Sequence, residues 1–318
     1  DAAFPAAFLA PPQYVGAFDG SQIGAGDPYW YHTQWSIPDA VNPTQPGGGC
    51  VQAGLGYGPF TWGVGNTHAS MCWNENGFGE DGYSVALWGS GKNGLACGAE
   101  LDVFLSPTTP NYAQSVQGAG LDYGIVQDAP SLDQHVSLIL EFGAKIGYAD
   151  VKVKCSQGNP SAPCGHGNKV DYGGAMVAVI LENEVTKQIF FYQIYLYDTR
   201  PASCGPDTCG SEEFWFDAGS QPFNDGTTWY GATHTIGYYN APCLMPGGPG
   251  QKYALNLLPQ LKKLLSKGPP ALNAGIPPLD AASHHWRLTQ MYVGTVLVGA
   301  VELNSVWYDI DLKGYGDW

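Results

Sequence analysis

The chain has 318 residues, with 28 Asp and Glu against 13 Lys and Arg, and its formal net charge at pH 7 is −15. Such a charge repels phosphate backbones and anionic lipids, and it therefore excludes nucleic acid and membrane surfaces as partners. It also argues against a strongly anionic polymer, because Arg and Lys hold carboxylates and sulfates. Apolar residues make up 44 % of the chain, enough for one large core. We therefore expect a single domain over 1–318 with a neutral or mildly polar partner.

The first 80 residues are rich in Gly, Pro and Trp, with runs such as Gly47-Gly-Gly. These runs predict a loop-rich N-terminal extension over 1–80 that packs on the main sheets. The chain begins Asp1-Ala-Ala-Phe-Pro, as a mature chain does after signal cleavage. No apolar run approaches the roughly 18 residues of a membrane span. We expect a secreted, extracellular or periplasmic protein.

Short apolar and aromatic segments, separated by Gly, Pro, Asn and Asp clusters, recur through the rest of the chain. This pattern predicts an all-β protein, an antiparallel β-sandwich or jelly roll with long loops. A hairpin connection is expected at 182–187. The predicted strands are 83–88, 99–105, 136–142, 149–154, 175–182, 188–198, 213–217, 234–239, 287–293, 295–303 and 305–312.

One segment has a helical period. Over 254–267, Leu257, Leu258, Leu261, Leu264 and Leu265 fall on one face. Pro259 suits the first turn of a helix and Gly268 suits its end, so we expect the helix to begin between 254 and Leu257. Three lysines on so acidic a chain are too few to favour a basic membrane-binding helix. The pattern therefore predicts one short amphipathic helix that lies over the sandwich.

The eight cysteines are an even number, and two pairs close short Pro- and Gly-rich loops. This spacing predicts the disulfides Cys155–Cys164 and Cys204–Cys209, in an oxidising compartment. Four cysteines remain and allow three pairings, of which we favour Cys72–Cys97 with Cys50–Cys243.

A pair of carboxylates marks the segment Cys97-Gly-Ala-Glu-Leu-Asp-Val-Phe-Leu105. In a strand, Glu100 and Asp102 point to one face, about 7 Å apart along the chain. Like charges at that distance raise one pKa, and a raised carboxyl beside an ionised one is the minimum equipment for glycoside hydrolysis. The alternative interpretation is a solvated strand face.

The Glu100-Leu-Asp102 motif resembles the Glu-x-Asp strand of the concanavalin-type sandwiches. Laminarinase-like glycosidases of that superfamily carry Glu-x-Asp-x-x-Glu, and legume lectins carry a metal-binding Val-Glu-Phe-Asp. This sequence has Leu105 where the glycosidase pattern has its second Glu. The resemblance implies a concanavalin-like architecture, and we assign no family from it.

Glu302 is a second candidate catalytic carboxylate. It is expected to continue the apolar face of Val296 and Val298 on one strand, either at the solvent-exposed end of that strand or in a cleft. A raised carboxyl on such a face also predicts an acidic activity optimum, at about pH 4–6.

The chain has 10 Trp and 19 Tyr, many of them in polar, loop-like settings. Aromatic rings beside Asn, Asp and Gln suit sugar rings. We predict that Trp73, Trp229, Tyr230 and Trp286 bind substrate. The alternative is that they cover the loops of a sandwich.

The seven histidines show no metal-ligand spacing, so we expect neither a metal site nor a cofactor, although a structural Ca²⁺ is compatible with the strand carboxylates. His234 with Tyr238, Tyr239 and Asn240 is a set that a polysaccharide lyase can use, but uronate substrates need basic residues that this chain lacks.

The sequence therefore predicts a secreted, acidic carbohydrate-active enzyme, an endo-acting glycoside hydrolase on a neutral polysaccharide or oligosaccharide, with Glu100 and Glu302 as essential carboxylates and Asp102 tuning Glu100. The alternative is a non-catalytic carbohydrate-binding or extracellular structural protein on the same sandwich.

Overall fold

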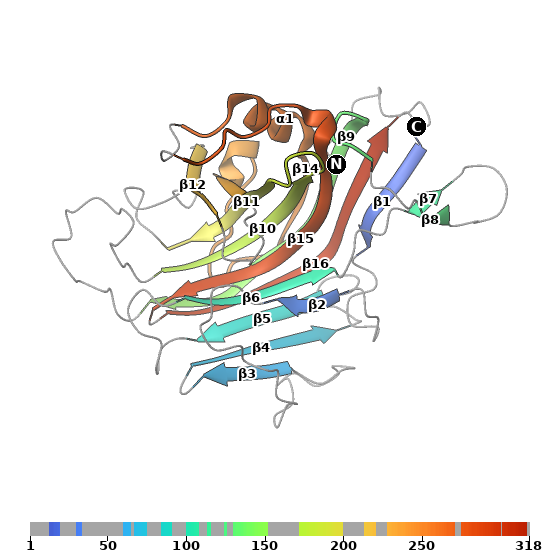
Figure 1. Cartoon of the computed structure of the whole chain (residues 1–318). Coiled ribbons are helices and arrows are strands. Elements are labelled where there is room, and N and C mark those ends of the chain that lie inside the picture. Colours follow the sequence, from blue (N-terminus) through green and yellow to red (C-terminus); the bar gives the residue numbers. More distant parts are fainter. Residues whose placement is uncertain are drawn as a thin grey trace.

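The computed structural model describes a defined set of residues: 13–19, 30–33, 60–64, 67–74, 84–90, 100–107, 113–115, 124–125, 130–151, 172–199, 213–220, 228–270, 275–299 and 301–316. Below residue 130, at 151 and over 213–220 it describes the backbone, together with the side chains of Leu87 and Trp215. Within these ranges the protein is a β-sandwich of the jelly-roll type, as predicted (Figure 1).

One sheet has nine strands. The long β16 pairs with β9 on one side and with both β5 and β1 on the other, and β14 pairs with the free side of β9. The strands are β1 (Gln13–Asp19), β3 (Phe60–Val64), β4 (Thr67–Asn74), β5 (Ser84–Ser90), β7 (Ala113–Ser115), β8 (Gly124–Ile125), β9 (His135–Val151), β14 (Gln251–Asn256) and β16 (Val301–Gly316).

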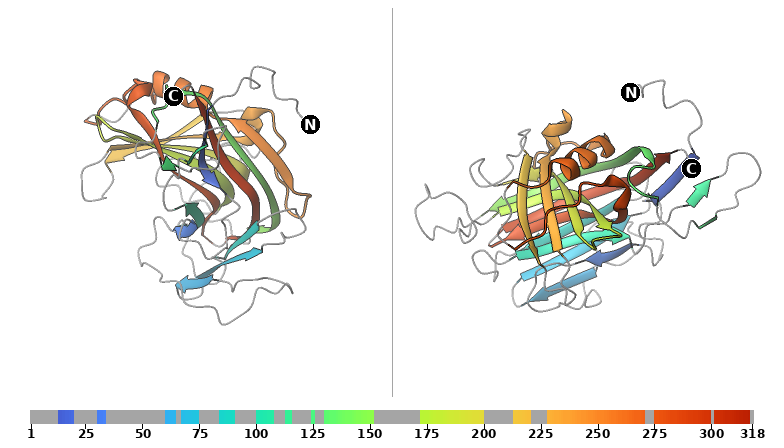
Figure 2. Two further views of the ribbon diagram at one scale, coloured as in Figure 1. Left: turned by 90° about the vertical axis from the view of Figure 1, so that its right-hand side faces the viewer. Right: turned by 45° about the horizontal axis from the view of Figure 1, so that its top comes forward.

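The other sheet has seven strands in the order β12-β13-β11-β10-β15-β6-β2. They are β2 (Trp30–Thr33), β6 (Glu100–Pro107), β10 (Tyr172–Asn183), β11 (Ile189–Asp198), β12 (Glu213–Ser220), β13 (Thr228–Thr235) and β15 (Trp286–Val298). The β10–β11 hairpin is confirmed, and the strands pair antiparallel except for β11 and β13, which run parallel. The strands of both sheets are strongly curved (Figure 2).

The main core lies between the sheets. Each strand contributes alternate side chains to it, including Val177 and Val179 from β10 and Tyr192 and Ile194 from β11. Trp286 and Trp307, one from each sheet, are fully buried there. This alternation is what a pleated strand with one face on a core requires.

The predicted helix exists but is shorter than 254–267. Helix α1 spans Leu258–Lys267, and 251–256 forms β14 instead, because the buried Tyr253 and Leu255 alternate with the exposed Lys252 and Ala254. That period of two suits a strand, and the helical period starts only at the leucine run. Asn256 Oδ1 accepts a bond from the Leu258 amide at the helix start.

One predicted strand break is absent and one predicted strand is wrong. The segments 136–142 and 149–154 belong to one strand, β9, in which Gly143 and Gly147 are covered by Tyr308 and Asn304 from β16. The segment 234–239 is not a strand: β13 ends at Thr235, and the 3₁₀ turn η4 (Ile236–Tyr239) follows. A second 3₁₀ turn, η5 (Ser283–His285), precedes β15.

The predicted strand 295–303 is divided by a corner. β15 ends at Val298, Gly299 has φ 76°, and β16 starts at Val301 in the other sheet. A positive φ favours glycine, which explains the residue at this corner. The region 1–80 also differs from a simple loop-rich extension, since it supplies β1, β2, β3 and β4 to the two sheets.

Candidate functional site

The seven-stranded sheet carries a second layer of side chains on the face that points away from the main core. On β10, Val177 and Val179 point to the core, whereas Met176, Ala178 and Ile180 belong to a separate cluster. We call this surface the second face. Its buried members are Met176, Ala178, Ile180, Tyr195, Tyr292, Val296 and Val298, with Tyr172, Ile189 and Phe191 half-buried against them.

A polar row crosses the second face over three strands. Gln193 on β11 donates from Nε2 to the Tyr292 hydroxyl on β15 at 2.7 Å. Its Oε1 accepts a bond from Thr233 Oγ1 on β13 at 3.3 Å. The intervening β10 residue is Ala178, which stands opposite both Gln193 and Tyr292, and its small side chain lets the two longer ones meet above it.

Aromatic side chains flank this row. The rings of Phe191 and Trp229 meet edge to face, with centroids 6.2 Å apart and an interplanar angle of 89°. Both residues are half-buried. Trp229, one of the predicted binding residues, therefore contributes to the second face.

The Glu100 and Asp102 pair lies on β6, at one side of this sheet. The register sets Asp102 opposite Val296 and Glu100 opposite Val298 on β15, and both valines belong to the second face. Antiparallel partners share a face, so these two carboxylate positions belong to the second face as well. Their side chains lie outside the described residues.

Glu302 is not on the same strand as Val296 and Val298, and this part of the prediction is wrong. The chain turns at Gly299, so Glu302 lies on β16 in the nine-stranded sheet, opposite Asp150 on β9 and Ser90 on β5. Its neighbours Val301 and Leu303 point into the main core, which leaves Glu302 half-buried on the opposite face of that sheet.

Tyr230 and Trp286 are also misassigned as binding residues. Each has a relative exposure of 0 %, and neither can line a sugar subsite. The Tyr230 hydroxyl donates to the carbonyl of Pro277, and Trp286 Nε1 donates to the carbonyl of Asp280 at 2.9 Å. Trp73 lies on β4 in the other sheet, and its side chain is outside the described residues.

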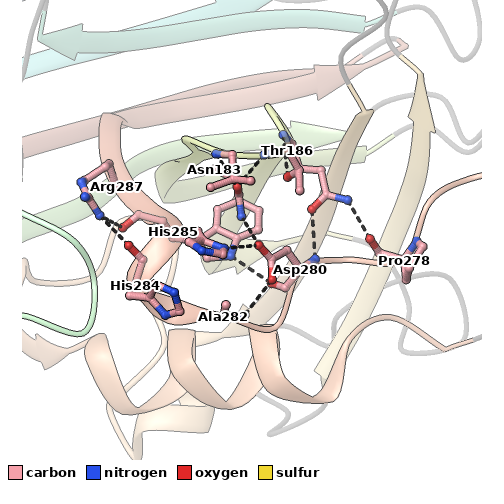
Figure 3. Close-up of polar contacts among 11 residues, drawn as sticks. Asn183, Thr186, Pro278, Asp280, Ala282, His284, His285 and Arg287 are labelled. Carbon is pink, nitrogen blue, oxygen red and sulfur yellow. Dashed lines mark hydrogen bonds and ion pairs between the residues drawn. The ribbon is translucent and has the colours of Figure 1, made fainter.

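The Trp286 contact belongs to a polar cluster around Asp280, and Figure 3 shows the bonds of Asp280 within this cluster. The Asp280 carboxylate accepts bonds from His285 Nδ1 at 2.7 Å, from Asn183 Nδ2 at 2.8 Å and from the Ala282 amide at 2.9 Å. Burial opposes ionisation of Asp280, but these bonds outweigh it and lower its pKa. The Asn183 side chain also accepts two backbone bonds of the β10–β11 turn. These hydrogen bonds hold segment 277–285 against the end of the seven-stranded sheet.

A second buried hydrogen-bond network contains His234, Tyr238 and Tyr239, the residues of the lyase-like set. Gln260 on α1 accepts from the Tyr238 hydroxyl at 2.5 Å and donates to His234 Nε2 at 3.3 Å. His234 Nδ1 therefore carries the proton and donates to the Tyr192 hydroxyl at 3.1 Å. Burial raises the pKa of Tyr239, which also contacts Tyr192. With His234 fully buried, this set connects α1 to the sheet and is not a lyase site.

Among the described residues, no group of three or more His, Cys, Asp or Glu side chains is arranged to hold a metal ion. In the same part of the chain, no helix has the length and apolar character needed to cross a membrane. Cys243 is disulfide-bonded. The predicted pairings of Cys155, Cys164, Cys204, Cys209, Cys72, Cys97 and Cys50 involve side chains outside the described residues.

Gln193, Thr233 and Tyr292 were not singled out by the sequence analysis. The available signal was a lone Gln inside Phe190-Phe-Tyr-Gln-Ile-Tyr195, a polar side chain on a strand that is otherwise apolar and aromatic. A buried amide needs partners. Those partners lie about 40 and 100 residues further along the chain, at Thr233 and Tyr292, and only the sheet order brings them together.

No protein-family model and no curated protein matches the sequence. Among solved structures, the family 11 xylanase from Neocallimastix patriciarum has a TM-score of 0.37 at 10 % identity, covering 91 % of this chain and 97 % of that one. The Trichoderma harzianum endoglucanase 3 of family GH12 has a TM-score of 0.31 at 10 % identity, covering 88 % and 100 %. A family 11 carbohydrate-binding module from Clostridium thermocellum has a TM-score of 0.32 at 7 % identity, covering 95 % of each chain. Similarity at this level carries no assignment of activity.

Proposed function

We propose that the protein is a secreted glycoside hydrolase that binds a neutral polysaccharide along the second face and cleaves it internally, with Glu100 and Asp102 as the essential carboxylates. The observation that carries this proposal is the chemistry of the second face, where half-buried aromatic rings and an oriented carboxamide lie side by side. Sugars offer apolar ring faces and hydroxyls to such surfaces.

The spacing of the two positions along β6 favours one stereochemical course. Residues i and i+2 on a strand are about 7 Å apart, and inverting glycosidases separate their carboxyl groups by about 6.5–9.5 Å to admit a water molecule. One carboxyl, protonated because its neighbour is ionised, would donate to the glycosidic oxygen, and the other would take a proton from the attacking water. Glu302 has no part in this proposal because it belongs to the other sheet.

The test is a reducing-end assay on a panel of neutral polysaccharides. We expect Glu100→Gln and Asp102→Asn each to lower kcat by about a hundredfold or more, whereas the matched control Glu302→Gln keeps wild-type activity. Proton NMR of the first product should show inversion at the anomeric carbon. Full activity in both the Glu100 and the Asp102 variants would refute the site.

A second candidate function is non-catalytic carbohydrate binding by the same face. It is favoured by the position of Glu302 in the other sheet, which leaves the two positions on β6 as the only sequence-predicted carboxylates on the second face. A pull-down on the same polysaccharide panel distinguishes the two functions, because a binding module is retained by the polymer without releasing reducing ends. A Ca²⁺ held by Glu100 and Asp102 would be consistent with this second function.

A further inference from the structure

Gln193 has hydrogen-bonding capacity that the described residues leave unused. A carboxamide has two N–H donors and an oxygen with two lone pairs. Within the described residues, Tyr292 takes one N–H and Thr233 satisfies one lone pair. One donor and one acceptor therefore remain on a half-buried side chain whose orientation is fixed by neighbours on two other strands.

A second carboxamide lies on the same face of the sheet, on β15, which is separated from β11 by β10. Gln290 is two residues from Tyr292 on β15, on the same side of the strand, and it stands opposite Ile180. Ile180 in turn stands opposite Phe191, the half-buried ring that contacts Trp229. The half-buried side chain of Gln290 has no hydrogen-bond partner in the described part of the protein. Two carboxamides thus border one aromatic pair.

The charges near these residues favour an uncharged ligand. Among the described side chains, the cation nearest this part of the sheet by register is Arg287, opposite Glu182. The Arg287 Nη2 atom pairs with Glu184 Oε2 at 2.8 Å. The Lys187 Nζ atom lies 3.7 Å from Glu182 Oε1. A carboxylate or sulfate on a ligand would find no unpaired cation among the described side chains of this region, whereas hydroxyls match the donor and acceptor of Gln193.

The two carboxamides lie far from the β6 carboxylates. Tyr292 precedes Val296, the register partner of Asp102, by four residues, which is about 13 Å along a strand. This separation exceeds one sugar ring. We infer that Gln193 and Gln290, with Phe191 and Trp229, form a distal subsite for a neutral oligosaccharide that extends several sugar units from the cleavage point, an inference that rests on the proposed function.

The test measures how binding depends on chain length. For Gln193→Ala we expect KM on a long oligosaccharide to rise about five- to tenfold, the worth of one or two neutral hydrogen bonds, while kcat changes less than twofold. The advantage in kcat/KM of long over short oligosaccharides should fall by the same factor. The matched control is Gln251→Ala, a half-buried glutamine on β14 in the other sheet, which should keep wild-type constants.

Gln290→Ala tests the same subsite without removing a hydrogen bond within the described residues, so we expect this variant to fold normally. The Tm of each variant is measured to check that it is folded. If both variants keep the wild-type KM and length dependence while Glu100→Gln is inactive, the distal subsite is wrong and the proposed hydrolase stands. If Glu100→Gln and Asp102→Asn stay active, the hydrolase site itself is wrong. If the wild type binds without cleaving, dissociation constants replace KM in the same comparison.

Discussion

At the scale of single residues, the glycines inside β9 show how a strand tolerates residues that usually interrupt it. The ring of Tyr308 on β16 lies directly over Gly143, where any Cβ would meet its atoms. The Nζ atom of Lys252 on β14 lies 5.9 Å from the centroid of that ring and 3.1 Å from Asp309 Oδ2. The missing side chain of Gly143 is therefore replaced by a cross-strand aromatic ring.

Gly143→Ala tests this packing. We expect the free energy of unfolding to fall by about 1–3 kcal/mol, because Tyr308 must leave a position in which it is 1 % exposed. Urea denaturation measures the change. In a Tyr308→Leu background, where the ring is gone, the same substitution should cost clearly less. An equal cost in both backgrounds would show that the ring is not the reason for glycine.

At the scale of secondary-structure elements, the sequence predicted the kind of element better than its ends. The leucine period of α1 and the hairpin between β10 and β11 were visible locally, since both depend on neighbouring residues. The predicted strand break near Gly143 is wrong because a side chain of the neighbouring strand covers this glycine. The predicted strand through Gly299 is wrong because the chain passes there from one sheet to the other. Both depend on residues far away in the chain.

The same distinction holds for the candidate site. The carboxylate pair on β6 and Trp229 could be selected from local sequence. The row of Thr233, Gln193 and Tyr292 could not, because it depends on strand order and on the small Ala178 between them. The burial of Tyr230 and Trp286 was equally hidden, since aromatic residues beside polar ones suit either a subsite or a satisfied core position.

The contact between helix α1 and the sheet supports a prediction at this scale. Gln260 is 5 % exposed and is the bridge from α1 to His234. Gln260→Leu keeps the apolar contacts of the helix but leaves the fully buried imidazole without that donor. We expect a loss of about 1–3 kcal/mol in the free energy of unfolding. Lys263→Ala, which removes the exposed contacts of the ammonium group with the Tyr238 hydroxyl and ring, should change it by less than about 0.5 kcal/mol. Equal effects would mean that Gln260 acts through helix propensity alone.

At the scale of the whole molecule, two electrostatic effects oppose each other as the pH falls. The net charge of −15 makes the folded chain repel itself at neutral pH, and protonation of carboxyls relieves that repulsion. Asp280 acts in the other direction. Its folded pKa lies below the ordinary 3.8, so its contribution to stability is present above the ordinary value and is lost as the pH falls through the lower, folded value.

The balance predicts a maximum in Tm on the acidic side, at about pH 4–6, measured by thermal unfolding from pH 3 to 9. The fall in Tm from the maximum towards pH 9 should shrink in about 0.5 M NaCl, where screening acts over only a few ångströms. The fall below about pH 4 should persist in salt, because the Asp280 carboxylate is held by direct hydrogen bonds to His285, Asn183 and the Ala282 amide. Asp280→Asn should flatten that acid limb and leave the alkaline limb unchanged. A Tm that climbs steadily to pH 9 would contradict self-repulsion as the dominant effect, and an acid limb that Asp280→Asn leaves unaltered would remove Asp280 from the account.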